Sequence, residues 1–351
     1  TAATAVLLAQ EGHLDLQRPI ATYLPELDAN AELGRVTLHQ LLTHTAGLVD
    51  DPRRPLCEGA RALSDATVLA HVGARPGTVY LYSNFGYALA GLVIERTTSR
   101  AFADVVRERV LLPMGMSTAT FDFARVTLRG HPEGSGDKSR CLLAGPAGGL
   151  IASTRDLARW ARAMSEPATH PLGQRLVETL TTPYVETGAR PDEAYGYGVW
   201  ITKHGGVSVY HHGGGVQDFS AYIAWVPARR LGTAAAMNFG HAAMIDRVGG
   251  TLGVVVLREL SVLLDLPNDW RATLESPRRP LSAYVGTYVD RKSWLGRLCV
   301  RLVGSDQLAF DYPDGPPALL PASFAFRFAP GEQRARFVVT AVGVAERVGD
   351  D

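Results

Sequence analysis

The chain has 351 residues, more than one average core organises and about right for two domains. Lys plus Arg and Asp plus Glu each number 35, so the formal net charge is zero. That balance argues against a nucleic-acid-binding protein, which relies on a basic face. No apolar run reaches the roughly 18 residues of a membrane-spanning helix, so the sequence predicts no membrane span.

The first 265 or so residues are predicted to form one mixed domain of helices and strands. Ala-rich composition favours helices, which we expect over residues 1–12, 36–44, 84–98 and 101–110. Gly12 resembles a C-cap, and another helix begins at Ser153, where Ser153-Thr-Arg-Asp156 is typical of a capping box. Alternating apolar residues then predict strands over 195–202, 207–210, 219–226 and 232–238, before a helix over about 242–264.

A second, smaller domain is predicted over residues 277–351, after a linker over 266–276. Short β-type runs separated by turn residues indicate a small antiparallel sheet or partial barrel. We expect its strands over 284–288, 295–302, 308–312, 324–328 and 336–342. The aromatic residues of 281–288 are predicted to be core rather than ligand-binding.

One candidate site lies at Tyr82-Ser-Asn84, which follows a Pro-Gly turn and precedes the helical run 84–98. A tyrosine at a junction between loop and helix could present its phenolic oxygen to a cleft, with an amide beside it. The same triplet also fits an ordinary turn, so by itself it is weak.

A second candidate is His211-His-Gly-Gly-Gly215, at the end of a predicted strand. Its glycines would let another molecule approach the backbone, with N–H groups free for an oxyanion. A flexible turn is the alternative. The run suits a phosphate poorly, because no Lys-Ser/Thr follows it. It suits a metal poorly too, because adjacent histidines on a strand face opposite sides. The three cysteines, 57, 141 and 299, form neither a disulfide framework nor a metal knuckle.

Together these pieces resemble the serine β-lactamase-related family, which includes class C β-lactamases, D,D-carboxypeptidases, D-aminopeptidases and esterases. Tyr82-Ser-Asn84 is similar to its Tyr-X-Asn motif and His212-Gly-Gly214 to its Lys-Thr-Gly or His-X-Gly motif. Further blocks follow the family's order: the first helix with Gly12-His-Leu-Asp-Leu16, Leu41-Leu-Thr-His-Thr-Ala-Gly-Leu48, Pro113-Met-Gly-Met116, and Gly148-Gly-Leu-Ile-Ala-Ser-Thr-Arg-Asp156. The resemblance runs from residue 1 to about 240.

The resemblance implies an α+β fold: an antiparallel sheet flanked by helices, a helical subdomain, and a small lipocalin-like β domain behind it. It also implies that the nucleophilic serine and its lysine lie a few residues ahead of Thr1, with the family's first helix and strands before them. The chain as given should therefore be unable to acylate. A literal Ser-X-X-Lys occurs at Ser135–Lys138, but Gly134 and Gly136 disfavour the helix that such a motif needs, so we read a solvated loop.

The family roles carry over as expectations. Tyr82 would share general-base work with the missing lysine, Asn84 would orient that lysine and the substrate amide, and His212 would steer the substrate or polarise Tyr82. Gly213, Gly214 and Gly215 would bind the substrate, with the Gly215 N–H as an oxyanion donor. All of this requires Tyr82 and residues 212–215 to converge on a cleft facing the start of the first helix.

The function predicted from these expectations is a serine acyl hydrolase that acts on an amide or ester through an acyl-enzyme in the intact parent. The His-X-Gly motif favours a peptidase or esterase over a true β-lactamase. The alternative is a non-catalytic binding or regulatory relative of penicillin-binding proteins. The predicted partner is a small-molecule or peptide substrate with an acyl group, without cofactor, metal or nucleic acid. A periplasmic or extracellular location follows from the resemblance alone, and the oligomeric state stays open.

Overall fold

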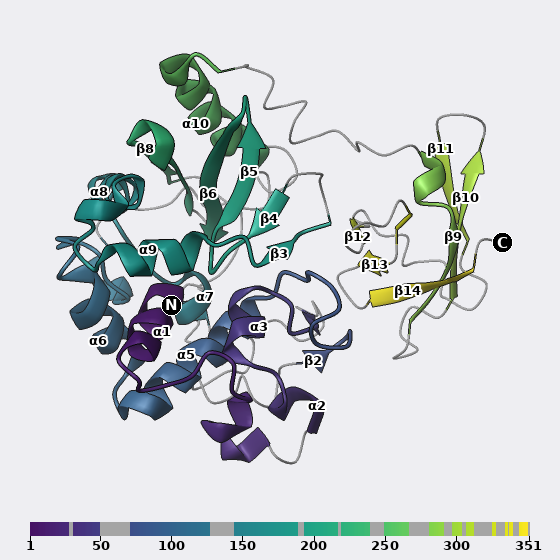
Figure 1. The fold of residues 1–351 in the computed structure, drawn as a ribbon, viewed down its shortest axis with the longest axis horizontal. Coiled ribbons are helices and arrows are strands. Elements are labelled where there is room, and N and C mark those ends of the chain that lie inside the picture. The colour runs from purple at the N-terminus through teal and green to yellow at the C-terminus, as the bar shows by residue number, and fades with distance from the viewer. Residues whose placement is uncertain are drawn as a thin grey trace.

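The structure is a computed structural model, shown in Figure 1. The residues it describes are 1–27, 31–49, 71–126, 144–188, 193–216, 219–238, 249–266, 281–290, 297–303, 307–311, 325–327, 334–335, 337–339 and 344–349.

Helices form most of the first half of the described chain. The α-helices are α1 (Ala2–Gln10), α2 (Ala31–Gly34), α3 (Leu38–Leu42), α5 (Asn84–Thr98), α6 (Phe102–Val106), α7 (Ala144–Gly148), α8 (Thr154–Ser165), α9 (Gln174–Thr181) and α10 (Gly249–Leu264). A π-helical turn, Arg107–Leu111, continues α6, so the helix predicted over 101–110 changes its hydrogen-bond pattern halfway. The Ser153 hydroxyl accepts from the Asp156 N–H and caps α8, but the predicted capping box is only half formed, because the Asp156 carboxylate accepts from Thr118 and Arg159.

Residues 185–237 of the first predicted domain form a six-stranded antiparallel sheet. Its order is β3 (Val185–Glu186), β4 (Glu193–Tyr195), β5 (Trp200–His204), β6 (Val207–Val216), β7 (Phe219–Val226) and β8 (Leu231–Met237). Helix α8 packs on β7 and β8, and α10 packs on β6, β7 and β8. A two-stranded ladder, β1 (Leu48–Val49) with β2 (His71–Val72), stands apart from this sheet.

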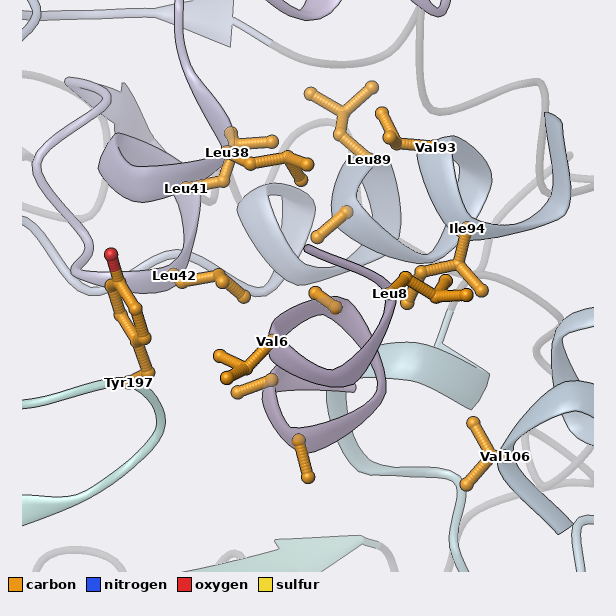
Figure 2. Close-up of a cluster of buried hydrophobic side chains, with 14 of the residues drawn as sticks. Val6, Leu8, Leu38, Leu41, Leu42, Leu89, Val93, Ile94, Val106 and Tyr197 are labelled. Carbon is orange, nitrogen blue, oxygen red and sulfur yellow. The ribbon is translucent and has the colours of Figure 1, made fainter. Parts of the chain in front are cut away.

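Helix α1 lies at the centre of the main hydrophobic core. Its residues are apolar on nearly every side, which is the pattern of a helix enclosed by protein. Figure 2 shows Val6 and Leu8 of α1 surrounded by leucines of α3 and by Leu89, Val93 and Ile94 of α5. The C-cap residue is Glu11, and Gly12 after it has a φ of +79°, so Gly12 ends the helix as predicted although one position beyond the cap.

The strand predicted over 195–202 is wrong as a single element. It divides into the end of β4 at Tyr195 and the start of β5 at Trp200. Gly198 has a φ of +79°, which breaks an extended strand, and a Cβ on Gly196 would come within 2.3 Å of the Leu180 carbonyl oxygen. The chain therefore turns a tight corner here instead of running straight.

The C-terminal residues form a second six-stranded antiparallel sheet, drawn away from the first in Figure 1. Its order is β11 (Gln307–Asp311), β10 (Arg297–Val303), β9 (Gly286–Asp290), β14 (Val344–Gly349), β13 (Phe337–Val339) and β12 (Ala325–Arg327). The sequence prediction missed β14, which lies beside β9. Tyr284 and Tyr288 are buried, so the aromatics here are core, as predicted. The domain boundaries stay predictions, because residues 267–280 lie outside the described residues.

Candidate active site

The segment from His44 to Gly47 acts as a backbone template for the loop that leads to Tyr82. The Gly47 carbonyl accepts from the N–H groups of Gly73 and Ala74, at 2.8 and 3.1 Å. The Thr45 carbonyl accepts from Gly77 at 2.7 Å, and the His44 carbonyl accepts from Leu81 at 2.7 Å. Both Gly47 and His44 have positive φ, +72° and +57°. The block that resembled a family signature thus fixes the path of residues 73–81.

Tyr82 ends this loop directly before α5. The next residue, Ser83, is the N-cap of α5, and its hydroxyl accepts from the Gly86 N–H. The half-buried Tyr82 ring lies between two other rings, 4.1 Å from His44 and stacked at 5.7 Å from Trp200, measured between centroids. Asn84, the first residue of α5, is likewise half-buried.

His212 lies on β6 within reach of the same cluster. Its ring centroid is 6.3 Å from that of Tyr82 and 4.3 Å from that of Trp200. The Tyr195 hydroxyl lies 3.2 Å from its Nε2, and its Nδ1 donates to the Gly213 carbonyl at 2.7 Å. Burial lowers the pKa of His212 to about 4, although the bond to Gly213 opposes the shift. His212 is therefore neutral at pH 7, and both of its nitrogens are engaged within the protein.

The neighbouring His211 has different partners. Its Nε2 lies 2.9 Å from the Thr202 hydroxyl and its Nδ1 lies 2.7 Å from the Tyr222 hydroxyl, both buried contacts. With both nitrogens satisfied inside the sheet, His211 is a structural residue.

The sequence reasoning assigned no role to His44 or Tyr195, yet both are central to the cluster. The His44 Nδ1 accepts from the Ser83 N–H at 3.0 Å, and its Nε2 lies 3.2 Å from the Tyr195 hydroxyl. Burial and the nearby His212 hold the pKa of His44 well below its usual value. His44 lay inside a block quoted only for its family resemblance, and Tyr195 lay in a predicted strand. A buried polar role for either depends on a contact between distant segments.

The glycines after His212 differ in what surrounds them. A Cβ on Gly213 would meet the Tyr222 ring at 2.7 Å, whereas one on Gly214 would meet no heavy atom within 4 Å. Strand β6 pairs with β5 only over residues 207–211, and with β7 over 210–216. Within the described part of the chain, residues 212–216 therefore have one edge not paired with a neighbouring strand. That edge can hydrogen-bond an extended acyl chain.

These surroundings predict opposite outcomes for two adjacent substitutions. Gly213→Ala forces its methyl group into the Tyr222 ring and is expected to lower the free energy of unfolding by about 1 to 3 kcal/mol. Gly214→Ala places the same methyl group in open space and should change that free energy by less than about 0.5 kcal/mol. Urea unfolding followed by circular dichroism compares the two. Equal stability of both variants would contradict the close contact between Gly213 and Tyr222.

The start of α1 is linked to this cluster through Gly198 and Tyr87, and the prediction that the cluster faces the start of the first helix stays a prediction. A Cβ on Gly198 would be 3.7 Å from the Cβ of Ala2 and 3.1 Å from the Tyr87 hydroxyl, and the Tyr87 ring lies 5.1 Å from His44. The Ser135–Lys138 motif lies outside the described residues. Among the residues that are described, no helix is long and apolar enough to cross a membrane, and no cluster of His, Cys, Asp and Glu could hold a metal ion.

Comparisons with known proteins find relatives of this chain among curated bacterial proteins. The D-aminopeptidase of Gluconobacter oxydans is 26% identical over 79% of this chain and 51% of its own length. Protein flp of Staphylococcus aureus is also 26% identical, over 66% of this chain and 49% of its own. The chain thus spans about half the length of these two curated relatives.

Solved structures show the same fold. A D-stereospecific amidohydrolase from Streptomyces sp. has a TM-score of 0.56 at 27% identity, covering 71% of this chain and 83% of its own. The octameric penicillin-binding protein homologue from Pyrococcus abyssi has a TM-score of 0.63 at 21% identity, covering 97% and 82%. The family model described as Beta-lactamase matches residues 1–256, and the chain belongs to that family.

Proposed function

We propose that this chain provides the substrate-binding and proton-transferring groups of a serine acyl hydrolase that cleaves an amide or ester bond next to a D-amino acid. The observation that carries the proposal is the approach of Tyr82 to His212, with ring centroids 6.3 Å apart, beside the edge of β6 at residues 212–216. The D-aminopeptidase and the D-stereospecific amidohydrolase among the relatives support the substrate class.

In the proposed reaction a serine oxygen bonds to the acyl carbon and gives up its proton to Tyr82 or the lysine. The tetrahedral intermediate collapses, the bond to the leaving amine or alcohol breaks, and that group leaves with the proton. Water then hydrolyses the resulting acyl-enzyme. The Gly215 N–H would stabilise the oxyanion, and Asn84 would hold the substrate amide. In the family's order the serine and lysine precede the helix that α1 resembles, so the proposal places them ahead of Thr1.

The first experiment separates this placement from the motif at Ser135. The 351-residue polypeptide is treated with a fluorophosphonate and its intact mass is measured. We expect no mass shift, and we expect the codons ahead of Thr1 to encode Ser-X-X-Lys. A shift that Ser135→Ala removes would instead make Ser135 the nucleophile and overturn the assignment.

The second experiment tests the substrate class. D-phenylalaninamide and its L-enantiomer are titrated into the 351-residue polypeptide, and the ring resonances of His212 and Trp200 are followed by NMR. We expect saturable shifts with the D-enantiomer and weaker shifts with the L-enantiomer, because the asymmetric edge of β6 orients the acyl chain. The absence of any difference between the two would contradict a D-specific site.

A further inference from the structure

We infer that His44 and Tyr195 are positioning residues, which join the Tyr82-Ser-Asn84 segment to His212 through a one-way chain of four hydrogen bonds. The chain runs from the Ser83 N–H through His44, Tyr195 and His212 to the Gly213 carbonyl. The role of these hydrogen bonds in catalysis rests on the proposed function, whereas the hydrogen bonds themselves do not depend on it.

The first end of the chain fixes the tautomer of His44. A backbone N–H can only donate, so the Ser83 N–H requires the His44 Nδ1 to carry a lone pair. Neutral His44 then carries its proton on Nε2 and donates it to the Tyr195 hydroxyl oxygen, 3.2 Å away. The same residue also accepts from the Leu81 N–H through its carbonyl, so His44 holds the backbone on both sides of Tyr82.

The other end fixes the tautomer of His212. A carbonyl can only accept, so the Gly213 oxygen requires the proton of neutral His212 to be on Nδ1. Its Nε2 is then a lone pair that needs a donor, and the Tyr195 hydroxyl lies 3.2 Å from it. Tyr195 has one proton, which goes to His212, while its oxygen accepts from His44. The two ends thus set the same direction for every bond between them.

The groups around the chain preserve this direction. The rings that face His44 are those of Tyr80, Tyr82, Tyr87 and Tyr195, all of them phenols. The Tyr87 hydroxyl is also hydrogen-bonded to Tyr195, but it donates its own proton to the Leu42 carbonyl at 3.0 Å, so it can accept from Tyr195 and does not replace His44 as the donor to it. Burial also raises the pKa of Tyr195 well above its usual value, which keeps the proton in the middle of the chain.

The chain assigns a specific task to His212. With Nδ1 committed to Gly213 and Nε2 to Tyr195, its ring does not carry protons to or from a substrate in this arrangement. It fixes the end of β6 relative to Tyr82, and no proton moves along the chain. His44 and Tyr195 hold the two motif segments in register from behind the site.

The test begins with the unmodified 351-residue polypeptide and needs no variant. Nitrogen-15 NMR of the histidine rings at pH 7 reports which nitrogen of each ring carries the proton. We expect His44 to be protonated on Nε2 and His212 on Nδ1. The opposite tautomer at either residue, or fast exchange between the two tautomers, would overturn the inference.

A pair of variants tests the middle of the chain. In Tyr195→Phe the His212 Nε2 loses its donor, so the lone pair becomes more basic and the pH midpoint of His212 should rise by about one unit. Tyr222→Phe removes the equivalent hydroxyl from His211, one residue along β6, and should leave the midpoint of His212 unchanged. An unchanged His212 midpoint in Tyr195→Phe, or the same shift in both variants, would refute the chain.

These outcomes are separable from the fate of the proposed function. If NMR finds the expected tautomers but no preference for the D-enantiomer, the chain of hydrogen bonds is established and the proposed substrate class is refuted. If the D-enantiomer binds preferentially but His44 or His212 has the opposite tautomer, only the chain of hydrogen bonds is refuted.

Discussion

Replacing Gly47 with alanine is expected to lower the free energy of unfolding by about 2 to 5 kcal/mol, from a backbone strain of about 1 to 2 and an overpacking cost of about 1 to 3 kcal/mol. Gly47 has a φ of +72°, a conformation that side chains with a Cβ rarely adopt. A Cβ there would lie 2.0 Å from the carbonyl oxygen of Ala74, so backbone rather than a flexible side chain must move. The movement would break the hydrogen bonds that the Gly47 carbonyl accepts from Gly73 and Ala74.

Gly12→Ala is the matched control, because it separates the two costs. Gly12 has a similar φ of +79°, but a Cβ there would meet no heavy atom within 4 Å. Its substitution should therefore cost only the backbone strain, about 1 to 2 kcal/mol, partly offset by the stiffer unfolded chain. Guanidinium unfolding of both variants gives the comparison. A difference of less than about 1 kcal/mol between them would show that the loop after Gly73 moves aside easily.

Several features of the fold and of the candidate site could be predicted from the sequence. The convergence of Tyr82 and His212 was anticipated because both motifs matched a family pattern in the right order. The cap at Ser153 and the glycine after α1 were anticipated because they depend only on neighbouring residues. Local signals of this kind can be recognised in a single sequence.

What could not be predicted depends on contacts between distant segments. His44 has a positive φ and bonds through its carbonyl to Leu81, 37 positions later, and the role of Tyr195 arises from two histidines, one 151 positions before it and the other 17 after it. The corner at Gly196 is imposed by the Leu180 carbonyl of α9. Gly213 was predicted to admit a substrate, yet its missing side chain is explained by the Tyr222 ring.

The buried histidines make the protein sensitive to acid, and this yields the second large effect. An unfolded histidine binds a proton near pH 6.5, whereas folded His212 stays neutral down to a pKa of about 4. Between these values the unfolded state binds more protons, so the free energy of unfolding must fall as the pH falls. Its contribution is complete above about pH 7 and is lost towards pH 4.

From pH 7 to pH 5 the loss due to His212 alone is expected to be about 2 kcal/mol. Burial lowers the pKa values of His44, His39 and His170 as well, so all three act in the same direction. Carboxylates titrate mainly below this window, which is why pH 5 is a better limit than pH 3. Urea unfolding at several pH values measures the slope.

The comparison that assigns this slope uses His212→Gln, which removes the buried titrating group, and His13→Gln, which removes a histidine whose side chain is 61% exposed. His212→Gln should be less stable at pH 7 because its glutamine cannot reproduce both ring contacts, but its stability should depend less steeply on pH. His13→Gln should keep the slope of the unmodified protein. If His212→Gln kept the full slope, the acid sensitivity would belong to other groups, and folded His212 would bind its proton near pH 6.5, as in the unfolded chain, rather than near pH 4. The hydrogen bonds from Ser83 to Gly213 would then be disrupted already below about pH 6.5, because a protonated His212 would donate from Nε2 to the Tyr195 hydroxyl that must donate to it.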